Sequence, residues 1–567
     1  MFLTHLIINN YKSFPPKDTL IYFHTPKAVI IGKNNSGKSN ILSVIEFLLG
    51  NKDPRYVGIS KDNYYDAAKP LRVSAFLSFQ EGGEIYKLGL AKKYEAILYK
   101  EFKNEQPAFI EIQYSDSPLE LAEFDVAEES EVEAVEKKDS KFKILIQGKF
   151  PLHQKIKEVR TNLCKVIGVD SLRNPKDDLS GSKWSVFGQL MKTVLEDSAR
   201  YGELKTALNG LNTLVEEVLA EEKTEILKNA KLISFINDIK FQLTKDNQPS
   251  ELLKNLELFV KDKDKFIHVD DTGTGTQSAL IIGILEVALK YKSSSARIFF
   301  IDEPELFLHP LGIRYLGQLF KEFAKDKLSQ IIITSHSPTL LSVFHPTEII
   351  RLDKPADFTE VNQLPYDFKD IDNKLARQLA NGNSSEMFFA DKVLIVEGET
   401  EFILFQKLSL RSTDTNFFRN NIAVVNAGGK GSIVSIIKTL ELLKIKWYVI
   451  ADDDFLDMKQ TTSPVCKHLG LNHDSTKEEM RTEFFQHGIL ILKEGETENL
   501  IPDEDLVKLT GKDLAEVKAL KAIRPKLSET FEKELFGNTK PEIAFDIVNF
   551  YWKTTSPFDH LIKWVVS

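Results

Sequence analysis

The sequence predicts an α/β protein built around parallel sheets, and three observations support this fold class. Several short runs are apolar throughout, such as Ala28–Ile31, Ile298–Ile301 and Val393–Val396. Strands that are buried on both faces of a parallel sheet have this composition. Each run ends in a Gly-rich loop or in acidic residues, and segments with helical periodicity lie between the runs. Because binding sites in such sheets lie outside the carboxyl ends of the strands, we expect the function to be concentrated there.

Composition narrows the class of protein. The chain has 567 residues, of which 42% are hydrophobic and 28% charged, which suits a soluble protein of two or three domains. No apolar run reaches the ~18 residues of a membrane span and no signal peptide is evident, so we expect a cytoplasmic protein without a membrane partner. Two cysteines, Cys164 and Cys466, are too few for a disulfide framework or a zinc site. The net charge of −9 gives the protein as a whole no basic surface for nucleic acid, so nucleic acid would have to bind in a local basic groove.

The first chemical motif is a phosphate-binding loop. Gly32–Ser39 matches G-x-x-x-x-G-K-[ST] and lies between a predicted strand and the apolar helix Ile41–Leu49. In such a loop the backbone N–H groups hold phosphates at the N-terminus of the helix, where the helix dipole favours negative charge. Lys38 would reach the β- and γ-phosphates of ATP, and Ser39 would hold Mg²⁺. The residues expected to bind the nucleotide here are Gly32, Asn35, Gly37, Lys38, Ser39 and Asn40.

A second group of nucleotide motifs follows much later in the chain. Gly273, Gly275 and Gln277 form a G-x-G-x-Q string before the apolar helix Ser278–Leu289. Such a string is weak evidence alone, but its position before the next acidic strand end strengthens the prediction that it contacts nucleotide.

That strand end is typical of a Walker B motif. Asp302 follows Arg297–Ile301 and would bind the nucleotide Mg²⁺ through water, whereas Glu303 would polarise the attacking water as a catalytic residue. His336 follows the strand Gln330–Thr334, where ABC-type ATPases carry a histidine that contacts the γ-phosphate. A single histidine after a strand is usually structural, but the order of the four motifs favours the nucleotide-binding interpretation.

Two further strand ends carry paired acids. Glu397 ends the run Lys392–Val396, with Glu401 on the first turn of the next helix, and Asp452 and Asp454 follow Trp447–Ala451. Four carboxylates at one sheet edge repel one another unless cations bind them, and oxygen-only ligands suit Mg²⁺ or Mn²⁺. The alternative is a solvated acidic loop at two strand ends.

Three other segments complete the organisation. Residues 70–115 alternate apolar and polar residues, which predicts a small antiparallel sheet. Glu120–Glu136 contains acids and no base, which indicates an exposed loop. Residues 194–260 predict amphipathic helices that serve either dimerisation or an ordinary core; the apolar positions are Leu204, Leu208, Leu211, Val215, Val218, Leu219, Ile226, Leu232, Ile236 and Ile239.

The acidic segments carry a family resemblance. Glu397–Glu401, Asn426–Gly429 and Asp452–Asp454 resemble the three motifs of a Toprim domain, the metal-binding module of topoisomerases, DnaG-type primases and OLD-family nucleases. With a preceding ABC-type ATPase half, most of the chain resembles the OLD (overcoming lysogenization defect) family; residues 120–260 and the segment after Leu509 resemble it least. The expected domains are 1–155 (first ATPase part, Walker A), 156–262 (helical insertion for dimerisation), 263–385 (second ATPase part) and 386–567 (Rossmann-like Toprim domain with a parallel central sheet).

This resemblance implies further site residues. The family's downstream metal-ligand segment matches Leu492–Leu500, where Glu498 is favoured and Glu494 and Glu496 are alternatives. The metal ligands would then be Glu397, Glu401, Asp452, Asp454 and Glu498, with Glu397 also the candidate catalytic base. A late lysine that offsets charge on the scissile phosphate would be Lys553, with Lys563 as the second choice.

The predicted function is therefore an ATP-regulated, divalent-metal-dependent DNA endonuclease, with a role in prokaryotic defence suggested by the resemblance. The expected partners are DNA, ATP, at least a second copy of the chain, and a helicase or reverse transcriptase encoded alongside. The main alternative is an SMC- or RecF-like DNA-binding ATPase whose Toprim half does not cut. Strand passage and primer synthesis are less favoured, because no remaining segment resembles a strand-breakage or template-binding domain.

Overall fold

The protein is described here from a computed structural model, and for part of its helix and strand residues only the backbone is described. The described residues are 2–50, 60–79, 106–114, 132–136, 142–147, 165–169, 179–180, 185–196, 198–221, 224, 253, 255–262, 265–290, 297–306, 308–325, 329–365, 368, 383–457, 459–471, 475–493, 497–523 and 540–567.

The chain divides into two compact units, and each is described by itself. Unit 1 holds Met1–Leu6, Ser39–Asp62 and Ala67–Ser335. Unit 2 holds Ile7–Lys38, Asn63–Asp66 and His336–Ser567. The predicted domain boundaries differ from this division and stay predictions.

Unit 1 contains an antiparallel sheet in the order β4-β5-β7-β6. It confirms the antiparallel pairing expected for residues 70–115. The acidic segment predicted as a loop is a strand, β6, at residues 132–136, so that prediction is wrong there; residues 120–131 lie outside the described residues. The four strands are β4 (Leu71–Phe79), β5 (Gln106–Tyr114), β6 (Val132–Glu136) and β7 (Phe142–Gln147).

Unit 1 also contains the Walker B strand. This strand, β11, pairs in parallel with β8 on one side and β12 on the other, and all five of its residues are buried. Strand β8 falls within the range predicted for the helical insertion, yet it belongs to this parallel array. The elements are β8 (Lys165–Val169), α8 (Thr274–Lys290), β11 (Arg297–Ile301), α9 (Pro310–Phe323) and β12 (Ser329–Thr334).

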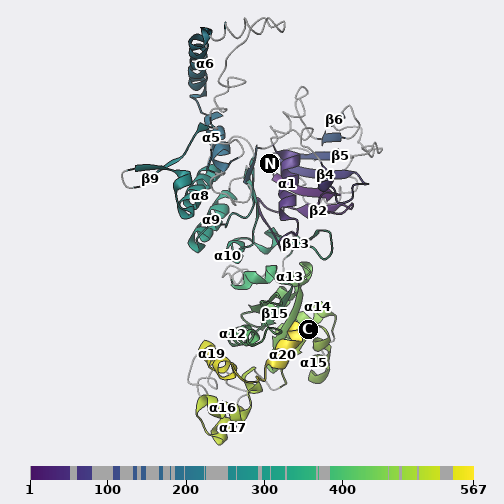
Figure 1. The fold of residues 1–567 in the computed structure, drawn as a ribbon. Helices are drawn as coiled ribbons and strands as arrows, with labels where there is room; N and C mark the ends of the chain where they lie inside the picture. Colours follow the sequence, from purple (N-terminus) through teal and green to yellow (C-terminus); the bar gives the residue numbers. More distant parts are fainter. Residues whose placement is uncertain are drawn as a thin grey trace. The chain divides into compact units, whose positions relative to one another are not determined.

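The helical part of the insertion is represented by α5 (Val186–Glu196) and α6 (Tyr201–Val218) (Figure 1). Helix α6 buries Leu208 and Asn212 only, while four apolar side chains on it are exposed: Leu204, Leu211, Leu214 and Val218. The apolar positions predicted from Ile226 to Ile239 lie outside the described residues. Unit 1 further holds the antiparallel hairpin β9 (Phe259–Asp262) and β10 (Lys265–His268), and η5 (Val269–Asp271), while η2 (Lys61–Asn63) extends across the division of the chain.

Unit 2 contains the strand that leads into the phosphate-binding loop. This strand, β3, pairs in parallel with β13, and β14 pairs antiparallel with β13. The elements of this region are β2 (Thr19–Tyr22), β3 (Lys27–Gly32), α10 (Pro338–Leu341), η6 (Pro346–Glu348), β13 (Ile349–Asp353) and β14 (Glu360–Gln363). Strand β1 (Phe2–Asn9) and helix α1 (Lys38–Leu49) extend across the division between the units.

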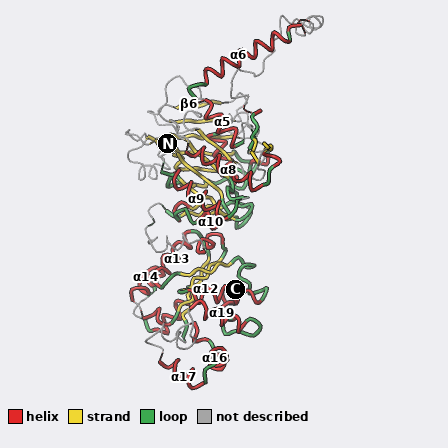
Figure 2. The backbone as a smooth tube through the Cα atoms, turned by 90° about the vertical axis from the view of Figure 1, so that its left-hand side faces the viewer, coloured by secondary structure: helices red, strands yellow, loops and turns green. Residues whose placement is uncertain are grey.

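The C-terminal part of unit 2 is a doubly wound α/β domain (Figures 1 and 2). Its four strands are all parallel, in the order β16-β15-β17-β18. Residues 393–396 of β15 are fully buried, because successive side chains point to opposite faces and helices cover both. Leu394 and Val396 pack with apolar residues of α12, α19 and α20, while α13 and α14 lie on the other face.

The domain consists of the helices and strands between Asn383 and Val566. They are η7 (Asn383–Phe389), β15 (Lys392–Val396), α12 (Glu399–Leu408), η8 (Ser409–Arg411), β16 (Ile422–Asn426), η9 (Lys430–Ser432), α13 (Ile433–Leu442), β17 (Lys446–Ala451), η10 (Asp453–Asp457), α14 (Lys459–Leu469), α15 (Lys477–Gln486), β18 (Ile489–Ile491), η11 (Thr497–Leu500), α16 (Asp503–Thr510), α17 (Leu514–Ile523), α19 (Lys540–Tyr551) and α20 (Asp559–Val566).

A buried arginine joins this domain to β13. The guanidinium of Arg351 donates to the backbone carbonyls of Phe388 (3.2 Å), Ala390 (3.2 Å) and Leu443 (2.9 Å), and it pairs with Asp353 at 2.5 Å. In the part of the chain that the structure describes, no helix is both long and apolar enough to cross a membrane.

Candidate functional site

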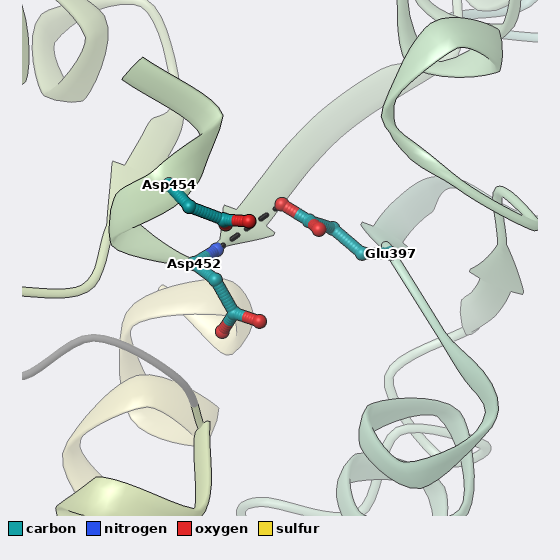
Figure 3. A group of neighbouring side chains, drawn as sticks. All are labelled: Glu397, Asp452 and Asp454. Atoms are coloured by element: carbon teal, nitrogen blue, oxygen red, sulfur yellow. Dashed lines mark hydrogen bonds between the residues drawn. The ribbon is translucent and has the colours of Figure 1, made fainter. Parts of the chain in front are cut away.

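The acidic residues at the ends of β15 and β17 meet at one edge of the parallel sheet. These strands are neighbours, with Val396 opposite Ile450, so Glu397 and Asp452 follow within one residue of the same level. The chain then turns into η10, which presents Asp454. One carboxylate oxygen from each of the three acids lies within 4.8 Å of the other two, and Figure 3 shows Glu397 reaching across toward both aspartates.

Glu397 is held in an unusual electrostatic environment. Its Oε1 accepts a hydrogen bond from the backbone N–H of Asp452 (3.1 Å), and its side chain is only 13% exposed. Burial raises the pKa of Glu397 to about 7, with further upward effects from Asp454 and Glu401; Lys430 and the Asp452 N–H act in the opposite direction. A pKa raised in this way is typical of a carboxyl group that acts as a base near neutral pH.

A fourth member of the cluster, Lys430, was not among the residues predicted from the sequence. Its Nζ lies 3.6 Å from Glu397 Oε2 and forms an ion pair with Asp454, and its side chain is 12% exposed. Burial alone would lower the pKa of Lys430, but Glu397 and Asp454 raise it above its ordinary value. The signal in the sequence was the lysine directly after Gly428-Gly429, at the end of a strand that neighbours β15.

Glu401 lies on the first turn of α12, as predicted, and is buried. Its Oε2 is close to the backbone, because a Cβ on Gly398 would lie only 2.9 Å from it. Among the described residues, Glu401 does not belong to the group of acids whose oxygens converge. Its role as a metal ligand stays a prediction.

The remaining predicted nuclease residues come from the C-terminal segments. The backbone of Glu498 lies in η11, but its side chain, like Glu494 and Glu496, lies outside the described residues. The adjacent Thr497 is buried and its Oγ1 donates to Asp452 Oδ1 at 3.4 Å, which brings η11 to the acid cluster. Lys553 is exposed just beyond α19, and Lys563 is exposed on α20.

The donor set of this cluster fits a divalent metal ion. Three carboxylates supply oxygen ligands only, which suits Mg²⁺ or Mn²⁺ and disfavours zinc, whose protein sites use nitrogen and sulfur. Two of these carboxylates are already paired with a cation, Lys430, which confirms that the site favours positive charge.

The phosphate-binding loop lies between β3 and α1. The side chain of Lys38 folds back over the loop, where its Nζ donates to the carbonyls of Gly32 (3.1 Å) and Lys33 (3.2 Å). Gly37 has a φ of +105°, and a Cβ there would lie 2.6 Å from Thr359 Oγ1, so both conformation and space require glycine. Asn35 also adopts a positive φ, +65°. This compact loop with exposed N–H groups at a helix N-terminus suits a nucleotide phosphate.

The Walker B acids are organised by hydroxyl groups. Asp302 accepts from Ser39 Oγ through Oδ2 (3.0 Å) and from Thr334 Oγ1 through Oδ1 (2.5 Å). Thr334 Oγ1 in turn accepts from the backbone N–H of Glu303 (2.9 Å), which has a φ of +50°. Ser39 and Asp302, the two residues predicted to hold the nucleotide Mg²⁺, are therefore in direct contact.

The third group of predicted nucleotide residues is less tightly clustered. Gly273 and Gly275 are exposed, and a Cβ on either would meet no described atom within 4 Å. The amide of Gln277 is buried and donates to the carbonyls of Val269 (3.0 Å) and Thr272 (3.2 Å), so it stabilises its own turn. His336 is half-buried directly after β12, and Asn40 is half-buried on α1. Contacts of these residues with nucleotide stay predictions.

Two families of known domains match this chain. The family described as "AAA ATPase domain" matches residues 1–341, and the family described as "Overcoming lysogenization defect protein-like, TOPRIM domain" matches residues 388–454.

Three curated relatives cover much of the chain. This chain is 27% identical over 308 residues to an OLD nuclease of Thermus scotoductus, and the aligned region covers 52% of this chain and 57% of that protein. It is 23% identical over 502 residues to the Old nuclease of Escherichia phage P2 (80% of this chain, 77% of that protein) and 24% identical over 495 residues to the endonuclease GajA of Bacillus cereus (83% and 78%). The chain thus belongs to the AAA ATPase domain family, and it carries a Toprim domain of the OLD-like type at residues 388–454.

Proposed function

We propose that this protein is a DNA endonuclease that uses a divalent metal ion, Mg²⁺ or Mn²⁺, and is regulated by ATP. The observation that carries the proposal is the convergence of Glu397, Asp452 and Asp454 within 4.8 Å at one sheet edge. Three carboxylates held this close repel one another, and Lys430 offsets only one of the three negative charges, so a divalent cation would stabilise them further. The names of the relatives, OLD nuclease and endonuclease GajA, support phosphodiester hydrolysis as the chemistry.

Glu397 is the residue best placed to move a proton. A pKa of about 7 lets its carboxylate accept a proton from the attacking water at neutral pH. Glu397, Asp452 and Asp454 would hold the metal, with Glu401 and Glu498 completing the ligand set and Lys553 offsetting charge on the phosphate. When bound, the metal would supply Lewis-acid stabilisation of the phosphoryl oxygens.

The ATPase domain supplies the regulation in this proposal. Lys38 and Ser39 would bind the phosphates and the Mg²⁺ of ATP, Asp302 would orient the hydrated ion, and Glu303 would polarise the attacking water. The exposed Gly273 and Gly275 are open to another chain, so we propose a homodimer in which this segment completes the partner's nucleotide site. A cytoplasmic role in antiviral defence, with a helicase or reverse transcriptase as a further partner, belongs to the same proposal.

Plasmid cleavage tests the proposal. Supercoiled DNA is incubated with Mg²⁺ or Mn²⁺ and the wild type, Asp452→Asn or Lys38→Ala protein, each with and without ATP. Cutting by the wild type that is lost in Asp452→Asn assigns the nuclease to the acid cluster, and a changed ATP response in Lys38→Ala assigns regulation to the phosphate-binding loop. Equal cutting by Asp452→Asn and wild type contradicts the assignment. Binding of DNA without cutting under every condition supports the alternative, an SMC- or RecF-like DNA-binding ATPase.

A further inference from the structure

We propose that Lys430 competes with the catalytic metal for the acid cluster. In the metal-free protein its ammonium group pairs with Glu397 and Asp454, and a divalent ion binds by displacing the ammonium group from these two carboxylates. This inference rests on the proposed metal site and adds a residue that sets how tightly the site binds its ion.

The geometry places the ammonium group among the carboxylates that the metal would use. Lys430 Nζ is 3.6 Å from Glu397 Oε2 and is ion-paired with Asp454 Oδ1. It approaches from the end of β16, whereas Asp454 follows β17, and β15 with Glu397 lies between those strands. Lys430 thus reaches over Glu397 to contact the acid on the far strand.

Hydrogen bonds hold the backbone before Lys430 in place, so displacement by a metal ion would move mainly the Lys430 side chain. Gly428 and Gly429 adopt φ values of +63° and +119°, which other residues rarely adopt. The N–H of Gly429 donates to the carbonyl of Glu397 (3.0 Å), and the N–H of Gly428 donates to Asn426 Oδ1 (2.7 Å). The turn that presents Lys430 is therefore tied directly to the residue with which its side chain pairs.

Two cations cannot share these oxygens without a cost. A divalent ion of this type binds carboxylate oxygens at about 2.1 Å, and an ammonium group already in contact with the same oxygens repels it. In the absence of metal, however, Lys430 and Glu397, which are 12% and 13% exposed, stabilise each other, because either charge would be costly alone. The ion pairs of Lys430 hold Glu397 and Asp454 together in the metal-free protein, and they lower the affinity of the site for the metal.

A matched lysine lies close to the cluster but outside it. Lys477 Nζ pairs with Asp457 (2.6 Å) and lies 3.8 Å from Asp453, neither of which belongs to the three converging acids. Removing the Lys477 charge leaves Lys430 in contact with the oxygens of the cluster. It therefore separates direct competition from a general change in local charge.

The test is a titration of the full-length, nucleotide-free protein with Mn²⁺, with free Mn²⁺ measured by electron paramagnetic resonance. Lys430→Met is expected to lower the Kd about tenfold, the equivalent of one pKa unit of interaction with a neighbouring charge. The Kd of Lys430→Arg is expected to stay within about twofold of the wild-type value, because arginine keeps the positive charge. The Kd of Lys477→Met is expected to stay within the same range, because Lys477 is an exposed charge outside the cluster. Unchanged or weaker Mn²⁺ binding by Lys430→Met, with the fold verified by circular dichroism, would overturn the inference.

Asp452→Asn distinguishes this outcome from a failure of the proposed function. If the wild type binds Mn²⁺ and Asp452→Asn loses that binding, the metal site is real, and the Lys430 variants then decide the inference alone. If Asp452→Asn binds Mn²⁺ as the wild type does, the metal site itself is misassigned. Should Lys430→Met fail to fold, Lys430→Gln carries the same expectation.

Discussion

The two acidic sites of this protein stabilise their carboxylates in different ways. Asp302 follows a buried parallel strand and accepts hydrogen bonds from the hydroxyl groups of Ser39 and Thr334. Glu397 and Asp454 also follow buried parallel strands, but they are paired with the ammonium group of Lys430. Hydroxyl donors orient a carboxylate and leave its charge intact, whereas a lysine neutralises it. The nucleotide site is thus prepared for an ion that arrives with ATP, and the Toprim site holds a cation of its own.

The largest expected effect concerns the Toprim acids. Glu397→Gln removes a metal ligand and the proposed base while keeping the size of the side chain, so we expect DNA cleavage to fall by roughly a thousandfold, comparable to the loss of a key electrostatic group in other active sites. Glu399→Gln is the matched control, because Glu399 is an exposed acid two residues away on α12. Comparable cleavage rates for the two variants would remove Glu397 from the mechanism.

A smaller effect should distinguish the hydroxyl contacts of the two sites. Thr334→Val removes a donor to Asp302 at 2.5 Å and the acceptor for the Glu303 N–H, so ATP hydrolysis should fall about 10- to 100-fold. Thr497→Val removes a longer contact, 3.4 Å, to an acid in a cluster that a lysine already neutralises, so DNA cleavage should fall by only about threefold. Steady-state assays of both activities in both variants check this. A larger effect of Thr497→Val on cleavage than of Thr334→Val on hydrolysis would contradict the comparison.

The smallest effect is the dependence of metal affinity on pH. Glu397 has a pKa raised from 4.5 to about 7, so the metal-free folded protein holds a proton there that the unfolded chain has lost. Metal binding must release this proton, and the affinity for Mn²⁺ should therefore rise about tenfold per pH unit below pH 7 and level off above it. By the same linkage, this group makes the metal-free protein less stable as the pH rises from 4.5 to about 7.

Isothermal titration calorimetry in buffers of different ionisation enthalpy checks the proton count. About one proton should be released per Mn²⁺ at pH 6 and almost none at pH 8. A proton count that is the same at both pH values would contradict the raised pKa of Glu397.

Much of the Toprim arrangement could be predicted because strand and acid are adjacent in the sequence. Lys392–Val396 and Trp447–Ala451 are apolar runs that end in acids, and parallel strands bring such ends to one edge. Lys430 could not be predicted in the same way. The sequence does not reveal that the strand before it pairs with β15, and an isolated lysine after a glycine turn is usually a surface residue.

Other features depended on tertiary contacts that no local pattern contains. The strand β8 is short and lies in a range where helical periodicity predominates, so only its pairing with β11 assigns it to the sheet. Glu401 was correctly placed on the first turn of α12, but the direction of its side chain depends on packing near Gly398. The positive φ of Glu303 follows from its hydrogen bond to Thr334, a residue on another strand.

The central claim is that Glu397, Asp452 and Asp454 bind a divalent metal ion. Crystals of the protein soaked in Mn²⁺ and measured at the manganese absorption edge test it most directly. We expect an anomalous peak about 2.1–2.2 Å from carboxylate oxygens of these three residues, with the Lys430 ammonium group displaced from Asp454. At a saturating concentration of Mn²⁺, the absence of a peak there, with Lys430 still paired to both acids, would contradict it.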